Sequence, residues 1–350
     1  LAMHGFVEAR FGDRTQARRW LALMWGAFGL AFLTKGPPAL LPLLAILGFD
    51  LLRADRERHR LFDIVGLGVF VLLALPWYLA VVHGNPGLLH YFIGDEVYNR
   101  IATDEFGRHG EWYGWLQVYA PTLLLGTMPW TPVLWRWARG LPADLRRWRK
   151  PETRAGDAAG LLLALWVLLP LLVFCLARSR LPLYLLPLFL PLSLLVARQW
   201  LAEGRRLPHW GWIAGWAALL LGLKFVAATM DTSKDAAAWA RAIRDRVPGE
   251  IYEVNAIDDL PRYGLHLELG VEVERLSLAP MRDAPRFNPA YDEDLARELA
   301  EREPNVVWHT PLKHLPAVRE RVEALGYRIE LLGAPYRDRA IFRIVPAAPR

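Results

Sequence analysis

Long apolar runs separated by short charged clusters occupy residues 1–230 of this 350-residue chain. Seven of these runs approach the roughly 20 residues that an α-helix needs to cross a bilayer. They are the segments 19–35, 38–52, 61–82, 115–137, 158–177, 181–201 and 210–230. Trp and Tyr stand near the ends of several runs, where aromatic side chains favour the membrane–water interface. The pattern predicts a polytopic α-helical membrane bundle of about seven transmembrane helices.

The remaining segment, 231–350, has a different pattern. It holds half of the charged residues of the chain, and short strand-like runs alternate in it with amphipathic helical stretches. Thr232 or Ser233 is the candidate N-cap of the first helix. The predicted helices are 233–247, 292–301 and 312–325, and the predicted strands are 251–254, 271–276, 306–308, 328–332 and 340–344. We therefore expect two domains, a membrane bundle over 1–230 and a small α/β domain over 231–350.

Basic residues predict the orientation of the bundle, because arginine-rich loops stay on the cytoplasmic side. Alternate loops carry the clusters Arg10, Arg14, Arg18, Arg19; Arg53, Arg56, Arg58, Arg60; Arg139, Arg146, Arg147, Arg149, Lys150, Arg154; and Arg205, Arg206. The other side of the membrane then receives Lys35, the loop 83–114, the turn Arg178–Arg180 and the whole segment 231–350.

The composition excludes several classes of protein. Hydrophobic residues make up 54% of the chain, which is incompatible with intrinsic disorder. The single Cys175 excludes an internal disulfide and a CxxC metal site. The formal net charge of +6 comes mainly from arginines that are not interleaved with aromatic residues on one soluble face, so we expect no nucleic-acid partner.

Three cations at the outer ends of separate helices are candidate binding residues, because an ionisable side chain at membrane level is costly. Lys35 closes an apolar run just before Gly36-Pro37, Arg180 stands two residues before Pro182, and Arg100 lies in the long outer loop. Each side chain alone also suits a snorkelling anchor. Their convergence favours a phosphate, which arginine binds well. The hydroxyl of Tyr184 lies one turn into the next predicted helix, at the same level.

The outer loop 83–114 is longer than a plain connection requires. Glu96, Arg108 and His109 stand in it among aromatic residues. Such residues either line a site or form the solvated face of a helix on the membrane surface.

Several motifs occur in the order seen in one family. They are Phe32-Leu33-Thr34-Lys35-Gly36-Pro37, Leu75-Pro76-Trp77-Tyr78, Tyr91-Phe92 with Glu96 and Arg100, Gly107-Arg108-His109-Gly110-Glu111-Trp112-Tyr113, Met128-Pro129-Trp130-Thr131 and Ser179-Arg180-Leu181-Pro182-Leu183-Tyr184. The chain resembles the polyprenyl-phosphate-dependent membrane glycosyltransferases of the GT-C class. Among them it is most similar to lipid A aminoarabinose transferases and bacterial relatives of protein O-mannosyltransferases.

The resemblance implies a multi-pass protein of the bacterial inner membrane with a periplasmic C-terminal domain. It implies a sugar donor linked to polyprenyl (undecaprenyl) phosphate, a lipid or protein acceptor and contact with membrane lipids. Lys35, Arg100, Arg180 and Tyr184 would bind the donor phosphate, with Glu96, Arg108 and His109 on the acceptor side. The family's catalytic Asp lies in an early periplasmic loop with no counterpart here, so we expect this chain to match the C-terminal part of such an enzyme.

Two departures from the family concern the site. Aminoarabinose transferases carry Glu-His where this chain has Glu96-Val97, and the His helps to hold a metal there. The cofactor is therefore unknown, with a divalent metal at Glu96 one option. The family's Lys is Arg180 here, which keeps the positive charge.

Two other functions remain open. A transporter or flippase for a lipid-linked or anionic solute would also use cations at membrane level, although such proteins usually carry inverted repeats and bind near the midplane. A membrane scaffold is the third possible function, and it gives the outer cations no role. The grouping of cations at one face favours the inverting glycosyltransferase.

Overall fold

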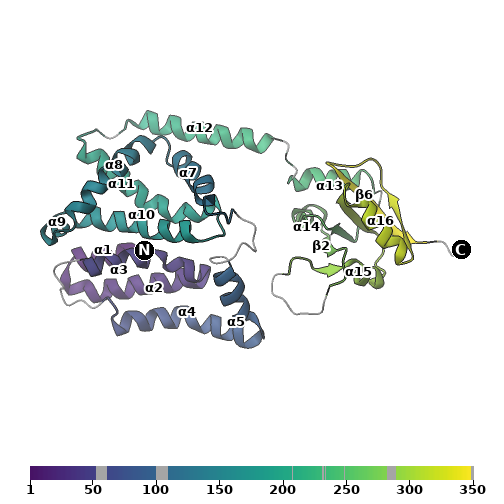
Figure 1. Ribbon diagram of the computed structural model, residues 1–350, viewed down its shortest axis with the longest axis horizontal. Helices are drawn as coiled ribbons and strands as arrows, with labels where there is room; N and C mark the ends of the chain where they lie inside the picture. The colour runs from purple at the N-terminus through teal and green to yellow at the C-terminus, as the bar shows by residue number, and fades with distance from the viewer. Residues whose placement is uncertain are drawn as a thin grey trace. The chain divides into compact units, whose positions relative to one another are not determined.

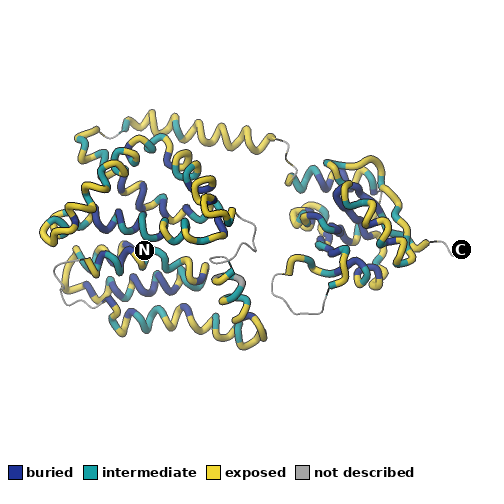
Figure 2. The backbone as a smooth tube through the Cα atoms, in the orientation of Figure 1, coloured by how far each residue is buried: buried dark blue, intermediate teal, exposed yellow. Residues whose placement is uncertain are grey.

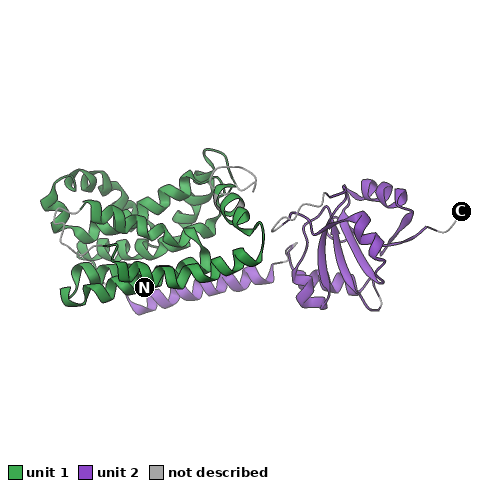
Figure 3. Ribbon diagram, turned by 90° about the horizontal axis from the view of Figure 1, so that it is seen from below, with its two compact units in different colours: residues 1–207 green, residues 208–350 purple. Residues whose placement is uncertain are grey.

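The computed structural model describes residues 1–52, 61–99, 109–206, 208–230, 232, 234–247, 249–281 and 289–347. The chain divides into two compact units, Leu1–Leu207 and Pro208–Arg350 (Figure 3). The domain boundary expected at residues 230 and 231 lies inside the second unit and stays a prediction.

All secondary-structure elements in the described part of unit 1 are helices (Figure 1). Most of its helices are built from apolar residues with few charges, as the sequence pattern predicts. In order they are α1 (Ala2–Phe11), η1 (Arg14–Gln16), α2 (Ala17–Lys35), η2 (Pro37–Leu40), α3 (Leu41–Leu52), α4 (Ile64–Gly84), α5 (Leu88–His90), η3 (Tyr91–Asn99), α7 (Gly114–Gly126), α8 (Thr131–Arg147), α9 (Pro151–Gly156), α10 (Ala158–Leu176), η4 (Pro182–Leu188) and α11 (Phe189–Ala202).

Within the described part of the chain, four helical segments are long and apolar enough to cross a membrane. They are Ile64–Gly84, Ala158–Leu176, Pro182–Ala202 and Trp210–Thr229, and Pro37–Leu52 is a shorter apolar helix. The continuous helix expected over 115–137 is wrong, because α7 ends at Gly126 and α8 begins at Thr131. Pro129 in the intervening segment has no amide hydrogen to donate, which disfavours an unbroken helix. The number of seven transmembrane helices remains a prediction.

Helices α2 and α4 pack in parallel. The indole nitrogen of Trp25, in the middle of α2, donates to the carbonyl of Leu61 just before α4, at 2.9 Å. Near their ends, the hydroxyl of Tyr78 donates to the carbonyl of Phe32 at 3.1 Å. The intervening α3 packs on α10 and buries Ile46 and Phe49 in the core of the unit.

Several ion pairs connect the helices of unit 1 with one another. Arg10 pairs with Asp50, and Asp157 at the start of α10 pairs with both Arg147 and Arg198. Arg136 pairs with Glu203 at 2.7 Å. These charges are thus neutralised within the bundle.

Unit 2 begins with α12 (Trp210–Thr229), which has no buried residue along its length (Figure 2). An apolar helix of 20 residues that is exposed on all sides suits a lipid environment.

The rest of unit 2 is an α/β domain. Its helices are α13 (Ala236–Arg244), α14 (Gly264–Leu269), α15 (Leu295–Glu301) and α16 (Leu315–Ala324), and its strands are β1 (Glu253–Ile257), β2 (Glu272–Ser277), β3 (Glu293–Asp294), β4 (Val306–Pro311), β5 (Tyr327–Leu331) and β6 (Arg339–Pro346). The sheet order is β3-β2-β1-β4-β6-β5. Strands β1 to β4 are parallel, while β6 pairs antiparallel with β4 and β5.

Each face of this sheet has its own apolar layer. Helices α13 and α14 cover one face, where Trp239 and Leu265 pack on Val254 and Val307. Helices α15 and α16 cover the other face through side chains that include Leu295 and Val318. The chain passes from β1 outward to β2 and β3, then returns to β4 on the other side of β1. In such open sheets, ligands bind at the carboxyl ends of the two strands where the order reverses.

The sequence prediction for this domain is largely confirmed. All five predicted strands form, and the predicted helices correspond to α13, α15 and α16. The expected cap at Thr232 is wrong, because Asp235 accepts the hydrogen bond from the amide of Ala238. Ser233 lies outside the described residues. Helix α14 and the two-residue β3 were not predicted.

Candidate functional site

Arg180 lies in the turn between α10 and η4 and is only 3% exposed. Its guanidinium donates to three backbone carbonyls, those of His109, Glu111 at 2.7 Å and Cys175 at 3.0 Å. Cys175 is in the last turn of α10, whose terminal carbonyls have no partner within the helix. Arg180 therefore holds the end of the outer loop against the end of α10.

Three buried polar atoms around this arginine have no hydrogen-bond partner among the described residues. They are Nε of Arg180, Oγ of Ser179 and the hydroxyl of Tyr119 in α7. Tyr119 is within electrostatic range of Arg180 and Tyr184. Tyr184 stacks on Phe174, with ring centroids 6.5 Å apart and planes 25° apart, and Tyr119 meets the same ring edge-on. Buried donors without hydrogen-bond partners suit an anionic oxygen.

Lys35 ends α2, and its side chain is exposed. The helix stops because Gly36 adopts φ 65° and ψ −150°, and Pro37 begins the next turn. Tyr78 closes on this end: a Cβ on Gly36 would lie 3.5 Å from its hydroxyl. The distance is an ordinary van der Waals contact, so the positive φ alone explains why glycine follows the lysine.

The outer loop begins with a helical segment that packs on the same helix end. Phe92 lies edge-on to Tyr78 with ring centroids 5.7 Å apart, and Tyr78 in turn meets Phe32 of α2. The neighbouring Tyr91 donates from its hydroxyl to Oε1 of Glu96 at 2.9 Å. A row of aromatic rings thus connects the segment of Glu96 to the end of α2.

The structure places the predicted residues in two groups. One group contains Arg180, Tyr184 and the backbone of His109. The other group contains the end of α2 with Lys35 and the segment of Glu96. Figure 1 shows the ends of α2, α4 and α10 at the same end of unit 1. Convergence of Lys35 and Arg180 on one phosphate stays a prediction. Arg100 and Arg108 lie outside the described residues.

The sequence analysis did not single out Tyr119 and Ser179. Tyr119 was hidden among apolar residues, and the useful signal is that a buried tyrosine hydroxyl normally needs a partner. Ser179 stands between Arg178 and Arg180 and begins one of the motifs, but it was not predicted as a site residue. His109 contributes its backbone carbonyl in this structure, whereas its side chain was the expected functional group.

Metal binding at Glu96 finds no support in the described residues near it. Two groups of three potential ligands occur in the described parts of the chain, both in unit 2 and neither including Glu96. Val97 offers no ligand atom where a histidine would. No step of the proposed reaction is therefore assigned to a metal.

Unit 2 has a cavity of about 490 Å³ at the carboxyl ends of β1 and β4. This is the place where the strand order reverses. Its lining residues are Asp258, Asp259, Leu260, Arg275, Pro311, Leu312, Lys313, His314, Asp338 and Arg339.

Asp259 is the centre of charge in this cavity. Arg339 donates to both of its oxygens, at 3.0 and 3.2 Å, and Arg262 donates at 3.2 Å. Burial alone would raise the pKa of Asp259, but the neighbouring His309 ring, 3.3 Å away, and the hydrogen bonds from Arg339 hold that pKa well below its usual range. The charges of the cavity thus largely neutralise one another.

The chain is similar in sequence to curated arabinosyl transferases. No protein-family model matches it. An undecaprenyl phosphate-alpha-4-amino-4-deoxy-L-arabinose arabinosyl transferase of Enterobacter sp. (strain 638) is 34% identical over 193 residues, which are 53% of this chain and 32% of that protein. A protein of the same name from Pseudomonas fluorescens is 34% identical over 216 residues, which are 60% of this chain and 36% of that protein.

The structural comparison covers nearly the whole chain. A crystal structure of ArnT from Cupriavidus metallidurans bound to undecaprenyl phosphate matches 97% of this chain and 72% of that one, with a TM-score of 0.65 and 16% identity. The apo state of the same protein gives a TM-score of 0.63. This chain therefore has the ArnT-like fold. The apolar helices and this fold indicate a multi-pass membrane protein.

The resemblance inferred from the motifs is confirmed in sequence and in fold. The chain spans about a third of the length of the curated relatives that it matches.

Proposed function

We propose that this chain is part of an inverting glycosyltransferase of the bacterial inner membrane. The enzyme transfers a sugar from a polyprenyl (undecaprenyl) phosphate donor to an acceptor on the periplasmic side. Lipid A, another glycan and a protein are the candidate acceptors. The bundle 1–230 crosses the membrane about seven times, and the domain 231–350 is periplasmic. The similarity to arabinosyl transferases supports this proposal.

The observation that carries the proposal is the buried group of polar atoms around Arg180. The phosphate of the donor is the leaving group, and negative charge grows on its oxygens as the glycosidic bond breaks. A fixed guanidinium and the hydroxyls of Tyr184 and Tyr119 stabilise that charge strongly in a pocket without water. Lys35 at the same end of unit 1 supplies a second positive charge. Arg100 is proposed as a third.

Other residues position the reactants. Arg180 holds the carbonyls of His109 and Glu111, which fixes this end of the outer loop beside the site, where it helps to exclude water from the donor. Glu96, Arg108 and His109 face the acceptor in this proposal. The general base on the acceptor hydroxyl is an Asp expected in a segment that precedes this chain.

Binding of the donor phosphate is the direct test. The chain in lipid nanodiscs is titrated with undecaprenyl phosphate, and we expect Lys35→Ala to weaken binding at least tenfold. Lys35 is exposed, so its loss leaves the fold intact. Lys150→Ala, an exposed lysine in an arginine-rich loop, is the matched control. Equal affinity of the two variants would refute the role of Lys35.

Transfer by the full-length gene product separates the enzyme from a flippase. A flippase binds the lipid phosphate and leaves the sugar attached to it, whereas the proposed enzyme releases undecaprenyl phosphate and glycosylates the acceptor. The orientation is tested separately in a Cys175→Ser background that carries Glu320→Cys on the exposed face of α16. A membrane-impermeant maleimide should label this cysteine from the periplasmic side.

A further inference from the structure

The layer between the sheet and α15 contains polar side chains where the fold predicts apolar ones. All five residues of the central strand β1 are buried. On the face covered by α15, this strand presents Ile257, and also Glu253 and Asn255. Glu274 of β2 pairs in register with Asn255 on the same face. Central parallel strands are normally apolar on both faces, so this polar patch needs an explanation.

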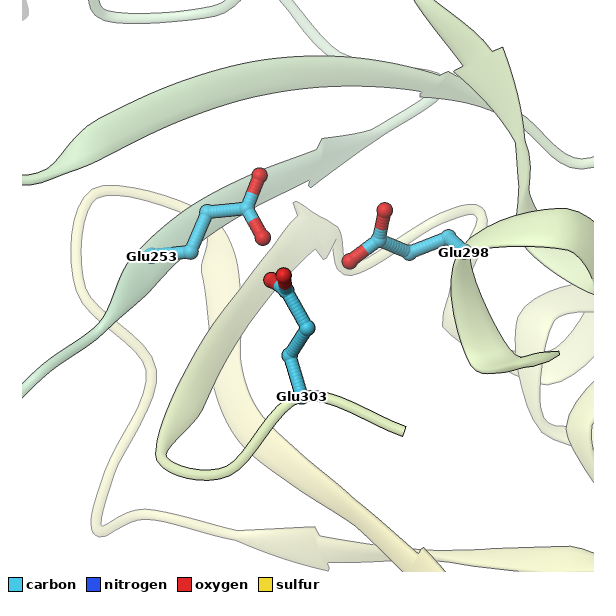
Figure 4. A group of neighbouring side chains, drawn as sticks. All are labelled: Glu253, Glu298 and Glu303. Atoms are coloured by element: carbon cyan, nitrogen blue, oxygen red, sulfur yellow. The ribbon is translucent and has the colours of Figure 1, made fainter. Parts of the chain in front are cut away.

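Glu253 meets two more carboxylates at the amino end of β1. Glu298 comes from the first turn of α15, and Glu303 comes from the loop between α15 and β4. Figure 4 shows the three side chains pointing toward one another, and their ligand oxygens lie within 4.8 Å of each other. Glu253 is 4% exposed and Glu298 is 5% exposed. Buried charges of one sign persist only if a proton or a cation compensates them.

Asn255 provides an independent sign of a missing partner. The residue is fully buried, and its amide nitrogen donates to Oε1 of Glu298 at 2.7 Å. Its Oδ1 has no hydrogen-bond partner among the described residues. Oδ1 and Nδ2 share one carbon, so the orphaned oxygen belongs to the same amide group that contacts the Glu298 carboxylate. A carbonyl oxygen without a donor next to carboxylates fits a cation.

We propose that Glu253, Glu298 and Glu303, together with Oδ1 of Asn255, bind one hard divalent cation of the Ca²⁺ type. Ca²⁺ takes 6–8 oxygen ligands at about 2.3–2.6 Å, which places opposite ligands about 4.6–5.2 Å apart. Carboxylate oxygens within 4.8 Å of one another match that size. The ion joins β1, α15 and the loop that follows it. It is thus a structural site that fastens one layer of the domain.

The competing explanation is a cluster that shares protons and binds no metal. Calorimetric titration of the full chain in detergent with CaCl₂ distinguishes the two. We expect one Ca²⁺ per chain, and at least tenfold weaker binding in Glu298→Gln. Glu320→Gln, which removes an exposed carboxylate of α16, should bind as the unmodified chain does. Absence of Ca²⁺ binding, or equal binding by Glu298→Gln, overturns the proposal.

Two further measurements keep the proposal testable if Glu298→Gln fails to fold. In the unmodified chain, Ca²⁺ should slow hydrogen exchange of residues 253–257 and 295–303, and protection elsewhere alone would contradict the site. Asn255→Asp retains an oxygen ligand and adds a charge. A cation site then keeps or raises its Ca²⁺ affinity, whereas a proton-sharing cluster loses thermal stability that Ca²⁺ does not restore.

Discussion

The guanidinium of Arg180 donates to the backbone carbonyl of His109, 71 residues earlier in the chain. This bond joins the turn after α10 to the end of the outer loop, and a second bond to the carbonyl of Glu111 fixes the same segment. Arg180 therefore has two tasks in the proposed enzyme. It positions the loop through carbonyls, and it contributes positive charge to the phosphate site.

Replacing Arg180 by Lys separates these tasks. Lysine keeps the charge but has a single nitrogen in place of the planar fork, so it cannot reproduce the contacts that Nη1 and Nη2 make from two separate positions. We expect the free energy of local opening of residues 109–113 to fall by about 1–3 kcal/mol in Arg180→Lys and at least as much in Arg180→Ala. Hydrogen exchange of that segment measures the effect. Arg146→Lys, at an exposed arginine of α8, should leave the exchange unchanged.

Gly114 tests the same contact from the other side. A Cβ at this position would lie 2.1 Å from the carbonyl oxygen of His109 and 2.9 Å from Nη1 of Arg180. Gly114→Ala must therefore push the loop away, and we expect a lower melting temperature. Gly140→Ala in α8 meets open space and should stabilise by about 0.5–1 kcal/mol, because glycine weakens a helix interior.

Combining Gly114→Ala with Arg180→Ala gives the control for this prediction. Both changes break one contact, so their effects on melting should be less than additive. Full additivity would mean that the glycine acts independently of the arginine.

Patterns that depend on residue type alone were sufficient for much of the fold. The apolar runs that became α2, α4 and α10 and the five strands were predicted, because burial selects apolar residues with a recognisable period. The break between α7 and α8 was not, since hydropathy averages over the residues around Pro129. Local backbone geometry decides such a break.

The site was harder to predict for a related reason. Arg180 was recognised by its charge, yet its partners are backbone carbonyls, which leave no trace in a side-chain pattern. In the sequence, Tyr119 is one more aromatic residue in an apolar helix, and nothing marks it as a site residue. Glu253 and Asn255 were hidden because their contacts come from α15 and from a loop about 50 residues later in the sequence.

Loss of the hydroxyl should lower the stability of the chain at Tyr78 but not at Tyr119. The hydroxyl of Tyr78 donates to Phe32, so Tyr78→Phe should cost about 1 kcal/mol of stability. The buried hydroxyl of Tyr119 has no partner among the described residues, so Tyr119→Phe should not destabilise the chain. Thermal unfolding in detergent compares the two variants.

The same pair tests the role of Tyr119 in phosphate binding. If its hydroxyl contacts the donor phosphate, Tyr119→Phe weakens undecaprenyl phosphate binding about tenfold, which corresponds to about 1.4 kcal/mol. Tyr78→Phe should bind with unchanged affinity once it is folded. Unaltered binding by Tyr119→Phe would place the phosphate elsewhere.

The pH dependence of the C-terminal domain should depend on His309. This side chain is 1% exposed and faces Asp259, Arg262 and Arg339. Burial lowers the pKa of His309, and the repulsion from the two arginines lowers it further, while the nearby Asp259 carboxylate opposes this shift. The folded domain therefore keeps His309 neutral at a pH where an unfolded chain, with a histidine pKa of about 6.5, takes up a proton.

Because the unfolded state binds more protons, the free energy of unfolding must fall as the pH drops below about 6.5, by at most about 1.4 kcal/mol per pH unit. His309→Gln removes this contribution, so its stability should vary less between pH 7 and pH 5. Asp259 does not obscure the difference, because its stabilisation is lost only below the unfolded Asp pKa of about 3.9.

The raised pKa values of Glu253 and Glu298 make the free energy of unfolding rise as the pH falls, which is opposite to the effect of His309. The unmodified chain and His309→Gln both contain these two residues, so their contribution cancels in the comparison. Hydrogen exchange of β1 and β4, corrected for the intrinsic rate at each pH, reports the stability of this domain within the full chain. Equal slopes for the two proteins would mean that His309 is already charged in the folded domain.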